Sequence, residues 1–198
     1  MTGLRTHRSR GNTDNFILGH AYFREEHARV IKADAKSCLD AAEAFEIDQD
    51  WLIRLCLALR DLPGRMVKGR ESHRFSKKSF VFLGREGDRF LRYGLSGQFW
   101  RADYGLSRSG MCTPEAWQAA YGQTRLLLEF EARSHDRGTT YLVTRTLISC
   151  PEDAERRRMA LYWALIRPVS GLIRRRILRA IAGQAGGMMR GHHSGSKV

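Results

Sequence analysis

The apolar and polar positions in the first third of the chain predict a strand followed by two helices. Residues 26–33 suit an extended segment, and Asp34 is placed to cap a helix over residues 35–45. A second helix is predicted from Asp48 to the Pro63-Gly64 stop, because its apolar residues recur at helical spacing. They are Trp51, Leu52, Leu55, Cys56 and Leu59.

In the middle of the chain, short apolar runs separated by glycine predict antiparallel strands. Residues 79–83 and 89–95 read as a hairpin across a turn at 84–88. Further strands are expected at 98–101 and 116–121.

Residues 125–133 and 140–148 form the strongest predicted strand pair, joined across residues 134–138. In the first member Leu126, Leu128, Phe130 and Ala132 should face one side, while Glu129 and Glu131 face the other. An antiparallel sheet follows, apolar on one face and charged on the other.

The pattern changes to a helical period over residues 152–184. Pro151 and the acidic residues after it suit the start of a helix, whereas Pro168 should kink the helix near residues 164–167, with Gly171 easing the bend. The predicted apolar stripe comprises Met159, Tyr162, Trp163, Ile166, Val169, Ile173, Ile177 and Ile181. The arginines expected outside it are Arg156, Arg157, Arg158, Arg167, Arg174, Arg175, Arg176 and Arg179.

Together these elements predict a single α+β domain, in which a curved antiparallel sheet wraps around a long C-terminal helix and two short helices follow the first strand. We expect the domain to span residues 16–185, with a flexible basic tail at 1–15 and a flexible Gly/Ser/His tail at 186–198. A kinked helix over a curved sheet leaves room for a hydrophobic cavity, toward which Tyr162 and Trp163 would point. The alternative is that both rings simply fill the core.

The segment 152–181, with its Tyr162-Trp163 pair, Pro168, Ser170-Gly171 and arginine cluster, resembles the end of an uncharacterised bacterial branch of the START-like, polyketide cyclase (SRPBCC, helix-grip) superfamily. The resemblance implies a helix-grip fold and a pocket between sheet and final helix. In that branch the preceding strand typically reads Thr-Glu-Thr-Arg, whereas here residues 144–147 read Thr-Arg-Thr-Leu.

Six residues are candidates for contact with a ligand in this space: Trp100, Glu129, Arg145, Tyr162, Trp163 and Ile166. Glu129 and Arg145 lie on adjacent predicted strands and can form a cross-strand ion pair. Facing the cavity, that pair could bind or polarise a carbonyl group; facing solvent, it would be structural.

A net charge of +13 and a pI of about 10.3 favour contact with an anionic partner. The excess lies in residues 64–108, with 11 basic and 4 acidic residues, and in residues 152–198, with 10 and 3. Either these arginines are solvated surface residues, or segment 65–78 and the final helix touch an anionic membrane or nucleic acid.

Catalytic and cofactor motifs are not found in the sequence. No nucleophile elbow, P-loop, dinucleotide fingerprint or HExxH is present, and the four dispersed cysteines suggest neither a metal site nor a redox pair. His20, His27, His73, His135 and His192-His193 are expected to be plain surface or satisfied residues. Cys150, near the helix start, could have a lowered pKa. Without a leader or a long apolar run, we expect a cytoplasmic protein with no cofactor and no metal.

Three functions remain open at this stage. The first is a binding protein for a hydrophobic or amphipathic small molecule or lipid. The second is a cyclase- or dehydrase-like enzyme acting on a polyketide-type carbonyl compound, although no motif requires an enzyme. The third is a peripheral binder of anionic lipid or nucleic acid.

Overall fold

The computed structural model describes residues 21–46, 80–101, 113–120 and 122–193, with side chains as far as residue 187. Several sequence-based predictions lie outside these residues: the second helix at 48–62, the basic segment 65–78, the tail at 1–15, and His20 and His73.

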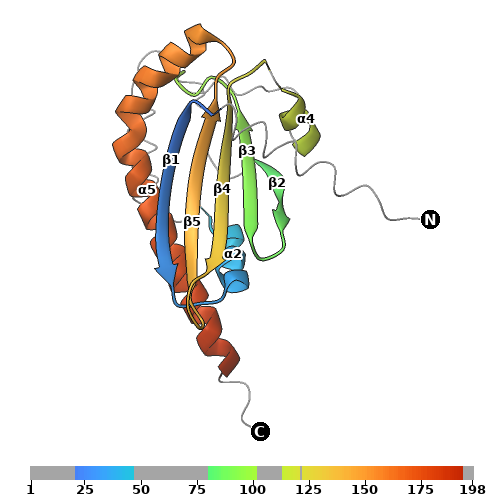
Figure 1. Cartoon of the computed structure of the whole chain (residues 1–198), viewed down its shortest axis with the longest axis vertical. Helices are drawn as coiled ribbons and strands as arrows, with labels where there is room; N and C mark the ends of the chain where they lie inside the picture. Colours follow the sequence, from blue (N-terminus) through green and yellow to red (C-terminus); the bar gives the residue numbers. More distant parts are fainter. Residues whose placement is uncertain (1–20, 47–79, 102–112, 121, 194–198) are drawn as a thin grey trace, which may run out of the picture.

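A single antiparallel sheet of five strands forms the centre of the molecule (Figure 1). Its order is β1-β5-β4-β3-β2. The strands are β1 (Phe23–Ile31), β2 (Val81–Glu86), β3 (Phe90–Ser96), β4 (Arg125–Ser134) and β5 (Thr140–Ser149). Strands β2, β3 and β4 each pair with the next strand in sequence, and β1 pairs with β5 at the other edge of the sheet.

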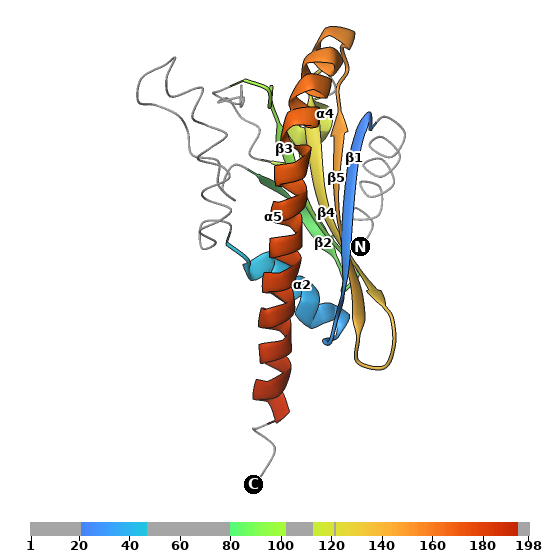
Figure 2. The same ribbon diagram turned by 90° about the vertical axis from the view of Figure 1, so that its left-hand side faces the viewer.

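Two helices cover one face of this sheet, which we call the inner face. They are α2 (Ala35–Ala44) and α5 (Asp153–His193), and Figure 2 shows both on the same side of the strands. Asp34 caps α2 as predicted, accepting a hydrogen bond from the backbone N–H of Ser37 at 2.7 Å. The main core lies between these helices and the inner face, with Leu39, Leu142 and Ile181 fully or almost fully buried.

Helix α5 remains continuous through Pro168 and follows a curved path along the sheet (Figure 1). Because Pro168 has no N–H, the carbonyl of Ala164 lacks its normal intrahelical donor. The helix also runs past residue 184, where its predicted end lies, to His193. No helix among the described residues is both long enough and apolar enough to cross a bilayer.

The opposite, outer face of the sheet carries the short helix α4 (Pro114–Ala119). Its Trp117 packs on Leu127 and Leu147, which alternate with the inner-face residues of their strands. A strand was expected at 116–121, and that prediction is wrong. Thr113 accepts a hydrogen bond from the N–H of Ala116 at 3.2 Å and Pro114 occupies the first turn, a helix start that the apolar pattern alone did not reveal.

Two further local predictions are corrected by the structure. Residues 98–101 form turns and bends instead of a strand. The hairpin turn between β2 and β3 lies at Gly87, with φ 53°, whereas Gly84 lies within β2 at a register shift. Together with the sheet order and the long last helix, the remaining elements confirm the predicted α+β helix-grip fold.

Substituting Gly94 by alanine should destabilise the protein. A Cβ at this position of β3 would lie 2.7 Å from Cε2 of the buried Trp117 ring, so strand or ring must shift. We expect a loss of about 1–3 kcal/mol in the free energy of unfolding, measured by urea denaturation. Gly122→Ala is the control, because nothing lies within 4 Å of its added Cβ. Equal losses in both variants would contradict the packing described for α4.

Candidate functional site

A group of polar side chains lies on the inner face of the sheet where strands β1 and β5 pair. In their antiparallel register Glu25 stands beside Thr146, and His27 beside Thr144. Residues two apart on a strand share a face, so these four side chains form one block beneath α5. The threonines are 1% and 3% exposed, and Glu25 is 8% exposed.

Arg174 of α5 reaches into this block. Its Nη2 donates to Oγ1 of Thr146 at 2.5 Å, and its Nη1 donates more weakly to Oγ1 of Thr144 at 3.4 Å. The residue as a whole is only partly buried, but its charged end contacts two buried hydroxyls and therefore lies in the interior. We name Glu25, His27, Thr144, Thr146 and Arg174 the inner polar cluster.

Glu25 and His27 form a close pair within the cluster. Nε2 of His27 lies 2.7 Å from Oε1 of Glu25, so the imidazole N–H donates to the carboxylate. The other carboxylate oxygen, Oε2, is buried and has no hydrogen-bond partner. An unpartnered buried carboxylate oxygen is costly in a folded protein, because it has lost its hydrogen bonds to water without gaining others.

A glycine of α5 lets the helix approach this pair. A Cβ added at Gly171 would lie 3.3 Å from Oε1 of Glu25 and 3.4 Å from Nε2 of His27, which is tighter than ordinary van der Waals contact. The absence of a side chain at Gly171 therefore sets how closely α5 lies over β1, and it keeps the Glu25–His27 pair beneath the helix backbone.

The guanidinium group of Arg174 is the principal charge in the cluster. Burial lowers the pKa of Arg174 to about 10, and the negative charge of Glu25 opposes that decrease. The side chain stays cationic at neutral pH, yet its hydrogen bonds go to neutral hydroxyls. Since a guanidinium group has five N–H donors, Arg174 has donors left for a carbonyl or carboxylate.

An apolar cluster adjoins the inner polar cluster toward the start of α5. Phe23 lies two residues before Glu25 on the same face of β1. The centroid of its ring is 6.2 Å from the centroid of the Trp163 ring. We call this group the aromatic cluster. Its buried members are Leu95, Phe99, Ile148, Cys150, Met159 and Trp163, and its partly buried ones are Phe23, Phe80, Trp100, Leu126, Tyr162 and Ile166.

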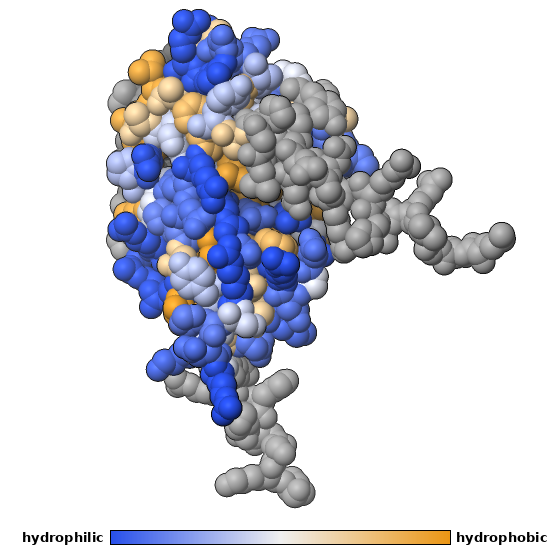
Figure 3. Space-filling model, viewed as in Figure 1, coloured by the Kyte–Doolittle hydropathy of each residue, from blue (hydrophilic) through white to orange (hydrophobic). Residues whose placement is uncertain are grey.

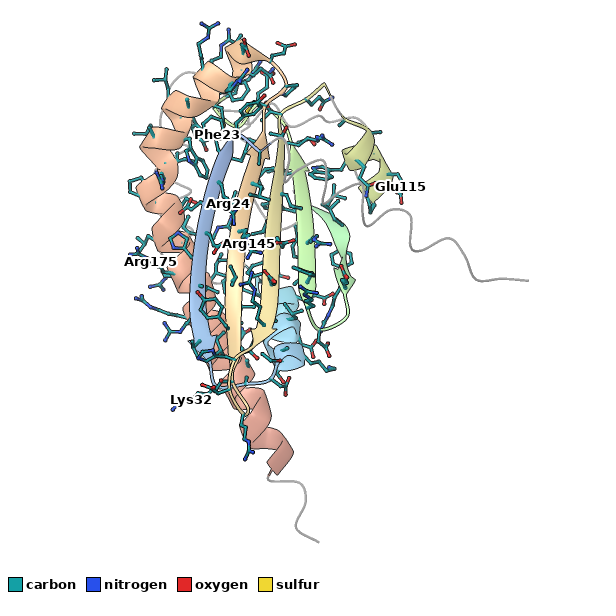
Figure 4. The ribbon with its side chains drawn as sticks, viewed as in Figure 1. Phe23, Arg24, Lys32, Glu115, Arg145 and Arg175 are labelled. Atoms are coloured by element: carbon teal, nitrogen blue, oxygen red, sulfur yellow. The ribbon has the colours of Figure 1, made fainter. Side chains whose placement is uncertain are left out.

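The six residues predicted to bind a ligand are divided between the two faces of the sheet. Trp100, Tyr162, Trp163 and Ile166 come together in the aromatic cluster. Glu129 and Arg145 lie on the outer face, away from α5, because they alternate with inner-face residues of β4 and β5. Figure 4 shows Arg145 with Arg24 on the side of the sheet turned to the viewer, opposite the helices.

Glu129 and Arg145 form the predicted cross-strand ion pair, within a larger network. Nη1 of Arg145 lies 3.0 Å from Glu129 and 2.6 Å from Glu131, and its Nε lies 2.7 Å from Glu26. Arg92 contacts the other oxygen of Glu129 at 2.8 Å. These charges compensate one another across the strands, so the pair does not face a cavity under α5.

Sequence reasoning missed Arg174 and His27. Arg174 was expected outside the apolar stripe, but it lies eleven residues after Trp163 and seven before Ile181, both close to whole numbers of helical turns. Val169 was placed in the stripe, but it is 40% exposed. His27 was expected to be a plain surface residue or one whose hydrogen bonds are satisfied. Because it lies two positions after Glu25 on an amphipathic strand, it shares that residue's face.

Cys150 does not have the environment of an activated thiol. Burial raises the pKa of the Cys150 thiol instead of lowering it, which corrects the suggestion of an activated cysteine. Cys38 and Cys150 are free and buried. Within the part of the chain that the structure describes, no three His, Cys, Asp or Glu residues are grouped so that they could hold a metal ion.

Comparison with solved structures gives distant structural neighbours. No protein family model and no curated protein matches the chain. TTHA0849 from Thermus thermophilus aligns with 84% of this chain and 99% of its own, at 10% identity and a TM-score of 0.30. The ZhuI aromatase/cyclase from Streptomyces sp. R1128 aligns with 83% of this chain and 93% of its own, at 13% identity and a TM-score of 0.30.

The ion-pair network of the outer face should contribute to stability in a pH-dependent way. Hydrogen bonds from Arg133 and Arg145 lower the pKa of Glu131 to about 2. A carboxylate with a depressed folded-state pKa stabilises the fold fully above its unfolded value near 4.5, and that contribution is lost as the pH falls toward 2. Glu131→Gln should therefore cost about 1–3 kcal/mol at pH 7 and progressively less below about pH 4.5.

Urea denaturation of both proteins across this pH range measures the difference. Glu46→Gln, which changes the same charge at an exposed position after α2, is the control. A wild-type advantage that stays constant down to pH 2 would contradict the assignment of this pKa.

Proposed function

We propose that the protein binds a small amphipathic molecule between the inner face of the sheet and α5. The carbonyl or carboxylate group of this ligand accepts hydrogen bonds from Arg174, and the apolar part of the ligand lies against the aromatic cluster. The observation that carries the proposal is the guanidinium group of Arg174, which is held in the interior by two neutral hydroxyls and has unused donors.

The arrangement of the two clusters supports an amphipathic ligand. A purely apolar molecule would leave the donors of Arg174 and the free oxygen of Glu25 without partners, which is unfavourable in the interior. A ligand oxygen that accepts from Arg174 removes that cost, and the rings of Phe23 and Trp163 next to the cluster offer an apolar surface.

Entry of a ligand requires the aromatic side chains to move apart, and α5 is weakened where this must occur. The carbonyl of Ala164, in the turn after Trp163, lacks an intrahelical donor because residue 168 is proline. Ala164 and Pro168 are both exposed, so water can hydrate this turn. A small change of helix direction there would separate the aromatic cluster from the sheet without breaking the packing of Ile177 and Ile181.

Replacing Arg174 should abolish most of this binding. The neighbouring arginines Arg174 and Arg175 provide a matched pair, since one enters the interior and the other is exposed. With dodecanoate as the probe, Arg174→Met should weaken binding about ten- to a hundred-fold, the value of a charge-assisted hydrogen bond, while Arg175→Met should change it less than about two-fold. Isothermal titration or quenching of tryptophan fluorescence measures both.

Further probes separate the polar from the apolar part of the site. The wild type should bind dodecanol more weakly than dodecanoate. Arg174→Met should bind the two probes with equal affinity. Native mass spectrometry of the purified protein would also reveal a ligand that remains bound. If neither dodecanoate nor an aromatic carbonyl compound binds, and no ligand co-purifies, the proposal is wrong.

A cyclase-like reaction is the second candidate, and the Glu25–His27 pair favours it. The free Oε2 of Glu25 could remove a proton from the carbon next to a ligand carbonyl, while His27 holds the other carboxylate oxygen. The electron pair left by that proton moves to the carbonyl oxygen, where Arg174 stabilises the enolate.

Exchange of the α-protons of benzoylacetone with deuterated water tests this step by NMR. We expect the wild type to accelerate exchange about ten-fold or more over buffer, and Glu25→Gln to remove the acceleration while dodecanoate still binds. His135→Ala is the control, because His135 lies in the exposed turn between β4 and β5. Equal exchange with and without protein would exclude proton abstraction at this site.

A further inference from the structure

The side of α5 that faces away from the sheet carries an exposed apolar row. Leu161 and Leu165 are 79% and 78% exposed, and Val169 and Leu172 are each 40% exposed. Their spacings of four, four and three residues place them on one stripe of the helix. Figure 3 shows hydrophobic residues among hydrophilic ones along the left margin of the molecule, where α5 runs in Figure 1. We call these four residues the outer row.

Arginines bracket the outer row at both of its ends. Arg157 and Arg158 precede it by one turn, and Arg175 and Arg179 follow it. All four are exposed, and none of them forms a salt bridge with any described residue. Figure 4 shows Arg175 on the side of α5 away from the sheet. After Glu155 the chain contains no acidic residue, so α5 offers Arg175 and Arg179 no counter-charge, and the acidic residues of its first turn, Asp153 and Glu155, precede the outer row.

The combination of the row and its arginines indicates an anionic bilayer surface as the partner. Leucine side chains enter the boundary between headgroups and acyl chains, while long arginine side chains reach anionic headgroups at the same depth. A nucleic acid would use the arginines but would leave Leu161 and Leu165 in water. A second copy docked row to row would bring like-charged arginines together at both ends of the contact.

We propose that the protein docks on anionic membranes through the outer row of α5, with its flanking arginines on the lipid headgroups. The docking surface and the inner polar cluster occupy opposite sides of one helix. Docking therefore does not depend on the ligand proposed for Arg174, and the two can be tested separately.

Co-sedimentation with vesicles of phosphatidylserine and phosphatidylcholine, compared with phosphatidylcholine alone, tests the proposal. We expect the full-length protein to bind the anionic vesicles and to release them as salt rises to about 0.5 M. Leu165→Glu should weaken binding about ten-fold or more, since it replaces inserted apolar surface by a charge that anionic lipid repels. Each of Arg158→Gln and Arg175→Gln should weaken it about five-fold.

Val30→Glu is the matched control, because Val30 is an exposed apolar residue, 47% accessible, on the outer face of edge strand β1. It adds the same charge as Leu165→Glu and should leave vesicle binding within about two-fold of the wild type. In a direct test of insertion, Leu165→Trp should show a blue-shifted fluorescence increment on anionic vesicles, and Val30→Trp should not.

Several results would overturn the proposal. One is the absence of vesicle binding at about 50 mM salt. Another is an equal loss of vesicle binding in Leu165→Glu and Val30→Glu. The membrane contact would then lie elsewhere on the protein, or would depend on net charge alone. Sedimentation velocity that shows a wild-type dimer split by Leu165→Glu, without vesicle binding, would make the occupant a second copy. Arginine-dependent DNA binding unaffected by Leu165→Glu, with no preference for vesicles, would assign the surface to nucleic acid.

Discussion

The pairing of β1 with β5 joins residues more than a hundred positions apart in the sequence and positions most of the features described above. It sets Glu25 beside Thr146 and His27 beside Thr144 on one face, and Glu26 beside Arg145 on the other. The same register places these polar residues beneath α5, where Gly171 lies over Glu25 and His27 and Arg174 contacts the two threonines. A slip by one residue would exchange the two faces of β1 and bring Arg24 and Glu26 beneath the helix.

The two faces of the sheet handle their charges in different ways. On the outer face Arg145 has carboxylates from three residues around it, so its charge is compensated within the sheet. On the inner face Arg174 meets hydroxyl groups, and the nearby carboxylate of Glu25 is bonded to His27 instead. Stability alone would favour an apolar residue at position 174, and a charge retained there at a cost to stability is typical of a binding site.

Much of the architecture could be predicted from the sequence because the apolar periods of β4, β5 and α5 are long and regular. The alternation from Leu126 to Ala132 correctly separated the two faces, and the Asp34 cap was correct because it depends on a local hydrogen bond. The strand expected at 116–121 was wrong since two aromatic residues outweighed the stronger helix-start signal of Thr113-Pro114-Glu115. The location of the site was harder to predict. Arginines on a basic helix look alike in sequence, and only the direction of each side chain distinguishes Arg174 from its neighbours.

Arg174 and Arg175 are consecutive residues that address different surroundings, because each step along a helix turns the chain by about 100°. Arg174 is fixed to the sheet through threonine hydroxyls, whereas Arg175 is exposed on the side of the helix away from the sheet. Both belong to one continuous helix, which has Pro168 between the aromatic cluster and these two arginines. A single helix thus carries both an arginine fixed to the interior of the protein and an arginine exposed to its surroundings.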